Sequence, residues 1–189
     1  MYEQLTKYIA DRSRLKDEDL QLVLAAFKPL QVKKNALVAR AGELSRRMFF
    51  VNKGCLRVYF IKPDGREVTR RFAFENSFSS SLTSFIGGTL LKESTQAVEP
   101  SELLYIDRLD FYDLVNTVPG WDLFYRHSLE YAYVTNTRRL EDFITLSARE
   151  RYRLLLEENP EVVLRLPNKL VANYLNITQE ALSRMKSEI

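Results

Sequence analysis

The chain has 189 residues, 46% of them hydrophobic, and a formal net charge of +3, which suits a folded protein with one sizeable domain and a small one. No apolar run approaches the roughly 20 residues that span a bilayer, so we expect a cytoplasmic protein without a membrane segment. A single cysteine, Cys55, and a single histidine, His127, are too few for an internal disulfide or an ordinary zinc or iron–sulfur site, and no metal is expected.

The first half of the chain changes from helical to strand-like periodicity. Apolar residues at helical spacing within the first 27 residues predict one or two helices that pack against the strand-like segments after them. From Pro29 to Ile106, short segments rich in β-branched and aromatic residues alternate with turn signals, which is typical of an antiparallel sandwich or jelly roll. Within this block CLRVYFIKPDGREVTRRFAF predicts a hairpin, because Pro63 presets a turn dihedral and Gly65 accepts a positive φ.

Helical segments come after the strand-rich block. Asp107 to Val118 predicts a short helix, and the segment from Pro119-Gly120 to Leu146 is long enough for about seven helical turns. Its apolar stripe has coiled-coil-like spacing with one polar residue in the middle, which suits a two-helix seam between two copies of the chain. The alternative is a helix that packs on its own domain. The stripe consists of Leu129, Tyr133, Asn136, Leu140 and Phe143.

The last stretch, PNKLVANYLNITQEALSRMKSEI from Pro167 to Ile189, predicts a helix-turn-helix. Ala172 is small where the two helices would cross closely, Asn176 stands where the turn needs a left-handed backbone, and Thr178 has the residue type of an N-cap. The apolar positions of the pair are Val171, Leu175, Ile177, Leu182 and Met185.

The outward side of the second helix carries side chains of the types that read bases and contact phosphates. Arg184 is suited to guanine, Glu180 to a cytosine amine, and Gln179 to adenine or a phosphate. Lys169 and Lys186 are candidates for contacts to the DNA backbone. The candidate DNA-binding residues are Lys169, Thr178, Gln179, Glu180, Ser183, Arg184 and Lys186.

Bulk charge supports DNA binding only weakly, because Ser147 to Ile189 holds seven Lys and Arg against six Asp and Glu. A structural helix hairpin with a polar face is the alternative interpretation. Several residues match the helix-turn-helix motif at the same time, and the segment follows a candidate dimer helix. Both observations favour the helix-turn-helix.

The order of these parts resembles the Crp/Fnr superfamily of bacterial regulators, the family of the cyclic AMP receptor protein. The stretch LSARERYRLLLEENPEVVLRLPNKLVANYLNITQEALSRMKSEI is most similar to the branch common in Bacteroidetes. The resemblance implies an α+β fold: an N-terminal cyclic-nucleotide-binding-like β-roll (jelly roll) with flanking helices, a long dimerisation helix, and a C-terminal helix-turn-helix domain with a short or absent wing. The implied domains are a sensor over 1–118, the dimerisation helix over 119–146 and the DNA-binding domain over 147–189.

The family also implies how a cyclic nucleotide would be held, by a Gly-Glu pair and a later Arg-Ser or Arg-Thr pair. In FENSFSSSLTSFIGGTLLKESTQAVEP these places are taken by Ser80-Ser81 and Glu93-Ser94. A carboxylate would then face the cyclic phosphate, and like charges a few ångströms apart repel by a few kcal/mol at an effective dielectric constant of about 20. Cyclic AMP or cyclic GMP binding in the usual mode is therefore not expected.

The sequence still allows a pocket for another effector at the same place, because the hydroxyl and carboxylate groups there suit a neutral or cationic small molecule. A ligandless scaffold is an equal alternative, and no cofactor is predicted. The candidate effector pocket is lined by Ser79, Ser80, Ser81, Thr83, Glu93, Ser94 and Thr95.

The sequence thus predicts a homodimeric, sequence-specific transcription regulator that binds double-stranded DNA, with RNA polymerase as a further candidate partner. The alternative is a small-molecule-binding module whose helix-turn-helix has lost DNA reading. An enzyme is not expected, because the sequence has no recognisable nucleophile–base pair, glycine-rich phosphate loop or metal-ligand cluster.

Overall fold

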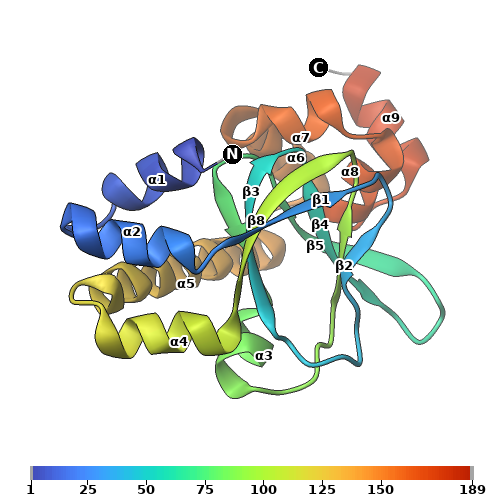
Figure 1. The fold of residues 1–189 in the computed structure, drawn as a ribbon. Helices are drawn as coiled ribbons and strands as arrows, with labels where there is room; N and C mark the ends of the chain where they lie inside the picture. The colour runs from blue at the N-terminus through green and yellow to red at the C-terminus, as the bar shows by residue number, and fades with distance from the viewer. Residues whose placement is uncertain (1, 188–189) are drawn as a thin grey trace. The chain divides into compact units, whose positions relative to one another are not determined.

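The computed structural model of the chain describes residues 2–187, so the last two residues of the predicted C-terminal domain lie outside it (Figure 1). The chain divides into two compact units. The first unit combines the residues up to Val58 with Phe72–Leu129, and the second combines Tyr59–Arg71 with the residues from Glu130 onward. Among the described helices, none is both long and apolar enough to cross a membrane.

Two four-stranded sheets make up the strand-rich block and confirm the predicted jelly roll. The first sheet has the order β1-β8-β3-β6, and its antiparallel register places Phe50 opposite Leu104 and Phe78. The second has the order β2-β7-β4-β5, so that β5 lies at an edge. The strands are β1 (Lys28–Val32), β2 (Leu37–Ala39), β3 (Arg47–Lys53), β4 (Leu56–Ile61), β5 (Glu67–Ala73), β6 (Ser77–Ser79), β7 (Ser94–Ala97) and β8 (Ser101–Asp107).

Helices precede, interrupt and follow the strands in the described chain. Before and within the block lie α1 (Glu3–Ala10), α2 (Asp17–Ala25) and α3 (Leu82–Gly87), and after it lie α4 (Arg108–Thr117) and the long helix α5 (Trp121–Thr145). The remaining helices are α6 (Ala148–Glu158), α7 (Pro160–Arg165), α8 (Asn168–Leu175) and α9 (Gln179–Ser187).

The short helix α7 was not among the elements predicted from the sequence. The structure places Pro160 at the first turn of α7. Proline suits that position, since its missing N–H would have no partner there and its fixed φ is already helical.

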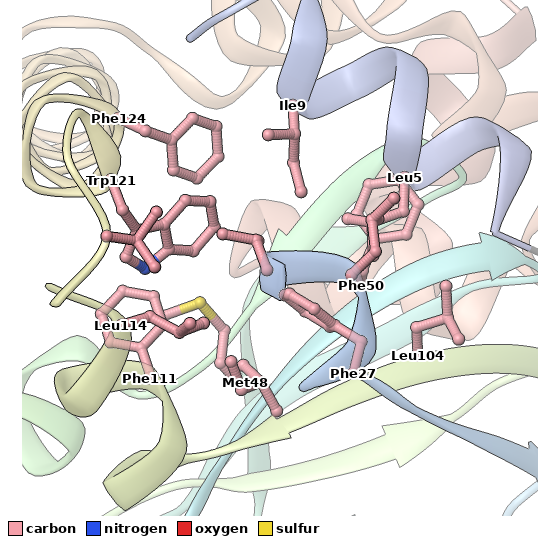
Figure 2. Packing of buried hydrophobic residues seen from close by; sticks show 14 of the residues in the cluster. Leu5, Ile9, Phe27, Met48, Phe50, Leu104, Phe111, Leu114, Trp121 and Phe124 are labelled. Carbon is pink, nitrogen blue, oxygen red and sulfur yellow. The ribbon is translucent and has the colours of Figure 1, made fainter. Parts of the chain in front are cut away.

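The main core of the first unit lies where α1, α2, α4 and the start of α5 cover one face of the first sheet (Figure 2). Successive residues of a strand point to opposite faces, so Phe50 enters this core while Phe49 enters a second cluster with Leu56 and Leu103. Trp121 stacks on Phe124 with ring centroids 4.6 Å apart. Figure 2 labels Leu5, Ile9, Phe27, Met48, Phe50, Leu104, Phe111, Leu114, Trp121 and Phe124 in this core.

The predicted hairpin is formed by β4 and β5, which are neighbours in the second sheet. Its turn closes with the Lys62 N–H donating to the Arg66 carbonyl over 2.8 Å, and Gly65 has the expected positive φ of 80°. The Asp64 carboxylate accepts from the Arg66 side chain, which holds the pKa of Asp64 below its ordinary value. The turn residues therefore determine the hairpin locally, as the sequence indicated.

Candidate nucleic-acid interface and effector region

The helices α8 and α9 form a closely packed pair in the second unit. Val171, Leu175 and Leu182 are buried, as predicted for its apolar positions, whereas Ile177 and Met185 are half-buried. Ala172 is also buried, with 2% of its surface exposed. A side chain of this size lets two helices approach closely, so the sequence expectation for the packing of the pair is confirmed at these positions.

The turn between the two helices depends on two side chains. Asn176 has φ 57° and ψ 44°, the left-handed conformation that asparagine tolerates better than most residues. The Thr178 hydroxyl accepts from the Ala181 N–H over 3.2 Å and caps the start of α9, as expected. Together they end one helix and start the next within three residues, which fixes the direction of α9 relative to α8.

Most of the predicted DNA-binding side chains lie on the exposed side of the pair. The structure leaves Gln179, Ser183, Arg184 and Lys169 exposed. The exposed Glu180 carboxylate accepts from its own backbone N–H and from the Thr178 hydroxyl, which lowers its pKa below the ordinary value. Glu180 therefore remains ionised at neutral pH and is turned toward the start of its own helix.

Lys186 differs from the other candidates because it is half-buried. Its ammonium donates to the Asn168 side-chain oxygen over 2.6 Å. This bond joins the end of α9 to the start of α8. The sequence spacing did not predict it, since the two residues lie 18 positions apart.

Asn173 of α8 supplies a contact that the sequence interpretation missed. Its side-chain oxygen accepts from the Thr69 N–H over 2.6 Å and from the Thr69 hydroxyl over 2.9 Å. Its amide nitrogen donates to the Glu67 carbonyl over 2.6 Å. The Asn173 amide therefore bonds two backbone groups of β5, in the way that a neighbouring strand would pair with the edge of the sheet.

The long helix carries the predicted stripe largely on its surface. Tyr133 is 72% exposed and Leu140 61%, while Leu129 is half-buried. The exposed Asn136 donates to the Ala132 carbonyl of its own helix over 2.8 Å. Phe143, the last predicted member, is half-buried against two arginine side chains of the second unit.

Further apolar side chains of α5 that the stripe did not include are also exposed. Ile144 has 74% of its surface exposed, Tyr131 71% and Val134 49%. Ile144 follows Leu140 at the i, i+4 spacing that places two side chains on one helix face. Ile144 therefore continues the exposed stripe where the sequence analysis expected Phe143 to do so.

Most side chains of the candidate effector region are buried. Ser79, Glu93 and Thr95 are buried, as are Ser81 and Ser94, whereas Ser80 is half-buried and Thr83 exposed. The described chain offers no hydrogen-bond partner to the buried Ser79 hydroxyl. The Ser94 hydroxyl accepts from the Ala41 N–H over 3.0 Å, so part of this polar set holds the roll together.

The helix α3 lies in the sequence between the two pairs that the resemblance assigns to nucleotide binding, and hydrogen bonds within the chain hold it in place. The Ser81 and Ser84 hydroxyls lie 3.4 Å apart, and Ser84 donates to the Leu90 carbonyl over 3.1 Å. At the end of the helix, the Arg108 guanidinium donates to the carbonyls of Phe85 and Ile86. The hydrogen bonds of these side chains therefore hold α3 in place within the chain.

A buried arginine of the second sheet was not among the residues that the sequence analysis singled out. Arg57 on β4 is 2% exposed, as deeply buried as the neighbouring Val58. The signal available in the sequence was a charged residue between two apolar residues of a predicted strand.

Separately, an open depression of about 460 Å³ is lined by Gly42, Glu43, Leu44, Arg46 and Leu90, which are not residues of the predicted pocket.

Comparison with known proteins agrees with this architecture. The family model of the cyclic nucleotide-binding domain matches residues 29–118. The structure of CLP, described as a c-di-GMP-responsive global regulator of Xanthomonas campestris, is 17% identical with a TM-score of 0.73 over 92% of this chain and 91% of its own. No curated protein matches the sequence significantly.

Two further solved structures have the same arrangement. A protein of Eubacterium rectale, assigned to the crp/fnr family of transcriptional regulators, is 18% identical with a TM-score of 0.73 over 95% of this chain and 85% of its own. The catabolite activator protein of Thermus thermophilus is 21% identical with a TM-score of 0.60 over 93% and 84%. Residues 29–118 therefore match the family of the cyclic nucleotide-binding domain, and the chain shares the fold of these solved regulators, as the sequence resemblance implied.

We predict that Asn173→Ala loosens the contact between α8 and β5. The substitution removes the acceptor of the Thr69 N–H and the donor to the Glu67 carbonyl, which costs the second unit about 1–3 kcal/mol. Amide hydrogen exchange at Thr69 should accelerate about tenfold or more. The Ala97 amide, which donates to the Ala36 carbonyl in the first unit, serves as the internal control. Unchanged protection of Thr69 in the folded variant would contradict the contact.

Proposed function

We propose that the protein is a homodimeric, sequence-specific DNA-binding regulator of transcription in the cytoplasm, which reads double-stranded DNA with α9. The observation that carries the proposal is the exposed polar face of α9, held on α8 by the left-handed turn at Asn176. The major groove is about 12 Å wide and admits a helix presented in this way. RNA polymerase is a further candidate partner of such a regulator.

The candidate DNA-binding side chains have different roles in this proposal. Arg184 offers a planar fork of N–H donors to guanine, and Gln179 offers an amide to adenine or to a phosphate. Lys169, at the start of α8, contributes a charge near the DNA backbone. Thr178 acts as the cap that positions α9, and Ser183 and Lys186 complete the surface. Glu180 accepts from a cytosine amine if its carboxylate turns away from the start of the helix.

A second copy of the chain is the proposed occupant of the exposed face of α5. Tyr133, Leu140 and Ile144 follow one another at spacings of seven and four, which aligns them on one side of a helix. Their combined exposure leaves apolar surface in water that an equivalent helix would cover. A two-fold pair would present two α9 helices to successive major grooves about one helical turn apart, which favours a roughly palindromic site.

The sensor domain is proposed not to respond to cyclic AMP or cyclic GMP in the usual mode. Glu93 stands in the place of the phosphate-binding arginine and is 5% exposed. A cyclic phosphate beside this carboxylate would have to overcome charge repulsion in a partly desolvated site. The unpartnered Ser79 hydroxyl supports a neutral or cationic small molecule instead. The internal bonds around α3 favour the alternative of a ligandless scaffold.

One alternative function has an observation in its favour. The near balance of charge from Ser147 to Ile189 and the use of Lys186 within the chain suit a small-molecule-binding module that has lost DNA reading. Measurements of DNA binding separate the two proposals.

Arg184→Ala is expected to weaken binding to the preferred duplex by about 10- to 100-fold and to relax the preference at one base pair, since a bidentate Arg–guanine contact contributes about 1–3 kcal/mol. Lys169→Ala should weaken binding to all sequences and reduce the slope of log K against log salt by about one. Fluorescence anisotropy with a duplex selected from a random library, repeated at several salt concentrations, measures both.

The matched control for these variants is Arg14→Ala, which removes an exposed positive charge from the first unit. It should leave affinity, sequence preference and salt slope near the wild-type values. A wild-type chain that enriches no sequence and shows no salt-dependent DNA binding would refute the proposed function.

Leu140→Glu is expected to weaken dimer formation at least tenfold, because it places a charge in the proposed apolar seam. Sedimentation equilibrium over a range of protein concentrations gives the dissociation constant. Leu164→Glu is the control, since Leu164 is 83% exposed on α7, away from the stripe. Equal dimer formation by both variants would rule out α5 as the interface.

Cyclic AMP and cyclic GMP at millimolar concentration should change Tm by less than about 1 °C. A ligand with a micromolar Kd would stabilise the folded protein by about 4 kcal/mol under these conditions, which a thermal-unfolding assay readily detects. Cyclic di-GMP, the ligand named for CLP, is measured in parallel. A clear rise in Tm with cyclic AMP would overturn the role given to Glu93.

A further inference from the structure

The C-terminal end of α8 must find donors for its last carbonyl groups, which have no partner within the helix. The turn supplies two of these donors. The Ile177 N–H bonds the Ala172 carbonyl over 3.0 Å, and the Asn176 N–H bonds the Asn173 carbonyl over 3.3 Å. The next two carbonyls of α8 accept from arginine side chains of other helices.

Arg139 of α5 binds the first of these two carbonyl groups, which belongs to Tyr174. Its guanidinium donates to the Tyr174 carbonyl over 3.2 Å and lies 3.7 Å from the centroid of the Tyr174 ring. It also lies 5.0 Å from the centroid of the Phe143 ring, one helical turn further along α5. Arg139 is half-buried, and this burial lowers its pKa below the ordinary value.

Arg151 of α6 binds the second. It donates to the Leu175 carbonyl over 3.4 Å and to the Leu146 carbonyl over 2.6 Å. Its guanidinium lies 4.6 Å from the centroid of the same Phe143 ring. Arg139, Phe143 and Arg151, named here the arginine clamp, thus connect α5 and α6 to the last residues of α8.

Two members of the clamp, Arg139 and Phe143, lie on the same turns of α5 as the exposed apolar stripe. Leu140 directly follows Arg139, and Ile144 directly follows Phe143. Adjacent residues of a helix point in directions about 100° apart, so one stretch of α5 serves the clamp on one side and exposes its stripe on another. Any rotation of α8 about this stretch would also turn α9, because the left-handed turn fixes the two helices to each other.

We propose that the arginine clamp is a positioning element that sets the angle of the reading helix to the dimer helix, and thereby the preferred spacing between two DNA half-sites. The inference rests on the proposed function, since it needs a dimer that reads DNA. Arginine suits this role because its planar fork bonds a carbonyl while its face stacks on an aromatic ring. Lysine would keep the charge without this fixed geometry.

The test uses the full-length protein and a library of duplexes that carry two copies of the selected half-site with spacers of different length. The wild-type chain should prefer one spacing. The double variant Arg139→Lys with Arg151→Lys should select the same half-site sequence. Its preference for the best spacing over spacers one base pair longer or shorter should fall about tenfold. The control is Arg138→Lys with Arg153→Lys, which alters exposed neighbours on the same two helices.

A purely structural role would reduce affinity equally at all spacings, so unchanged spacing ratios in a folded double variant would overturn the clamp and leave the proposed function intact. If the double variant does not fold, Phe143→Leu provides the same test, since it retains both arginines and removes the ring that they contact. The same fall in the spacing ratio is expected for it. Failure of the wild-type chain to enrich any half-site would refute the proposed function itself.

Discussion

The second unit depends on one constraint. The backbone carbonyl groups at the end of α8 need hydrogen-bond donors from outside the helix. A helix that stops among other elements leaves carbonyl groups without donors, and burying them unpaired costs free energy. The left-handed Asn176 turns two amides back to the helix. The carbonyls of Tyr174 and Leu175 then need donors with long reach, and Arg139 and Arg151 provide them. One helix end therefore links the turn, the long helix and α6.

Features that depend on neighbouring residues in the sequence were predicted correctly. The turn at Asn176, the cap at Thr178 and the hairpin at Gly65 each follow from the backbone preference of one residue and its immediate surroundings. The helix α7 was not predicted, although the same kind of local argument applies, since Pro160 suits the first turn of a helix. Local chemistry thus predicted where helices and strands begin and end better than it predicted how many of them there are.

Contacts between distant positions could not be predicted in this way. Asn173 and Thr69 are separated by 104 positions, and no periodicity connects them. The available signal was the residue type, since asparagine is a poor choice inside a helix unless its side chain has a partner. In the candidate effector region the sequence did not predict the burial of Glu93, and it did not predict the burial of Arg57 on β4, because both depend on how the sheets pack.

The bonds from Asn173 to β5 have a consequence for solubility. An edge strand presents unpaired N–H and C=O groups that can pair with another chain and start aggregation. In this protein a side-chain amide from α8 occupies two such groups, at Glu67 and Thr69. Local unfolding of α8 would therefore uncover a strand edge as well as disorder the helix pair.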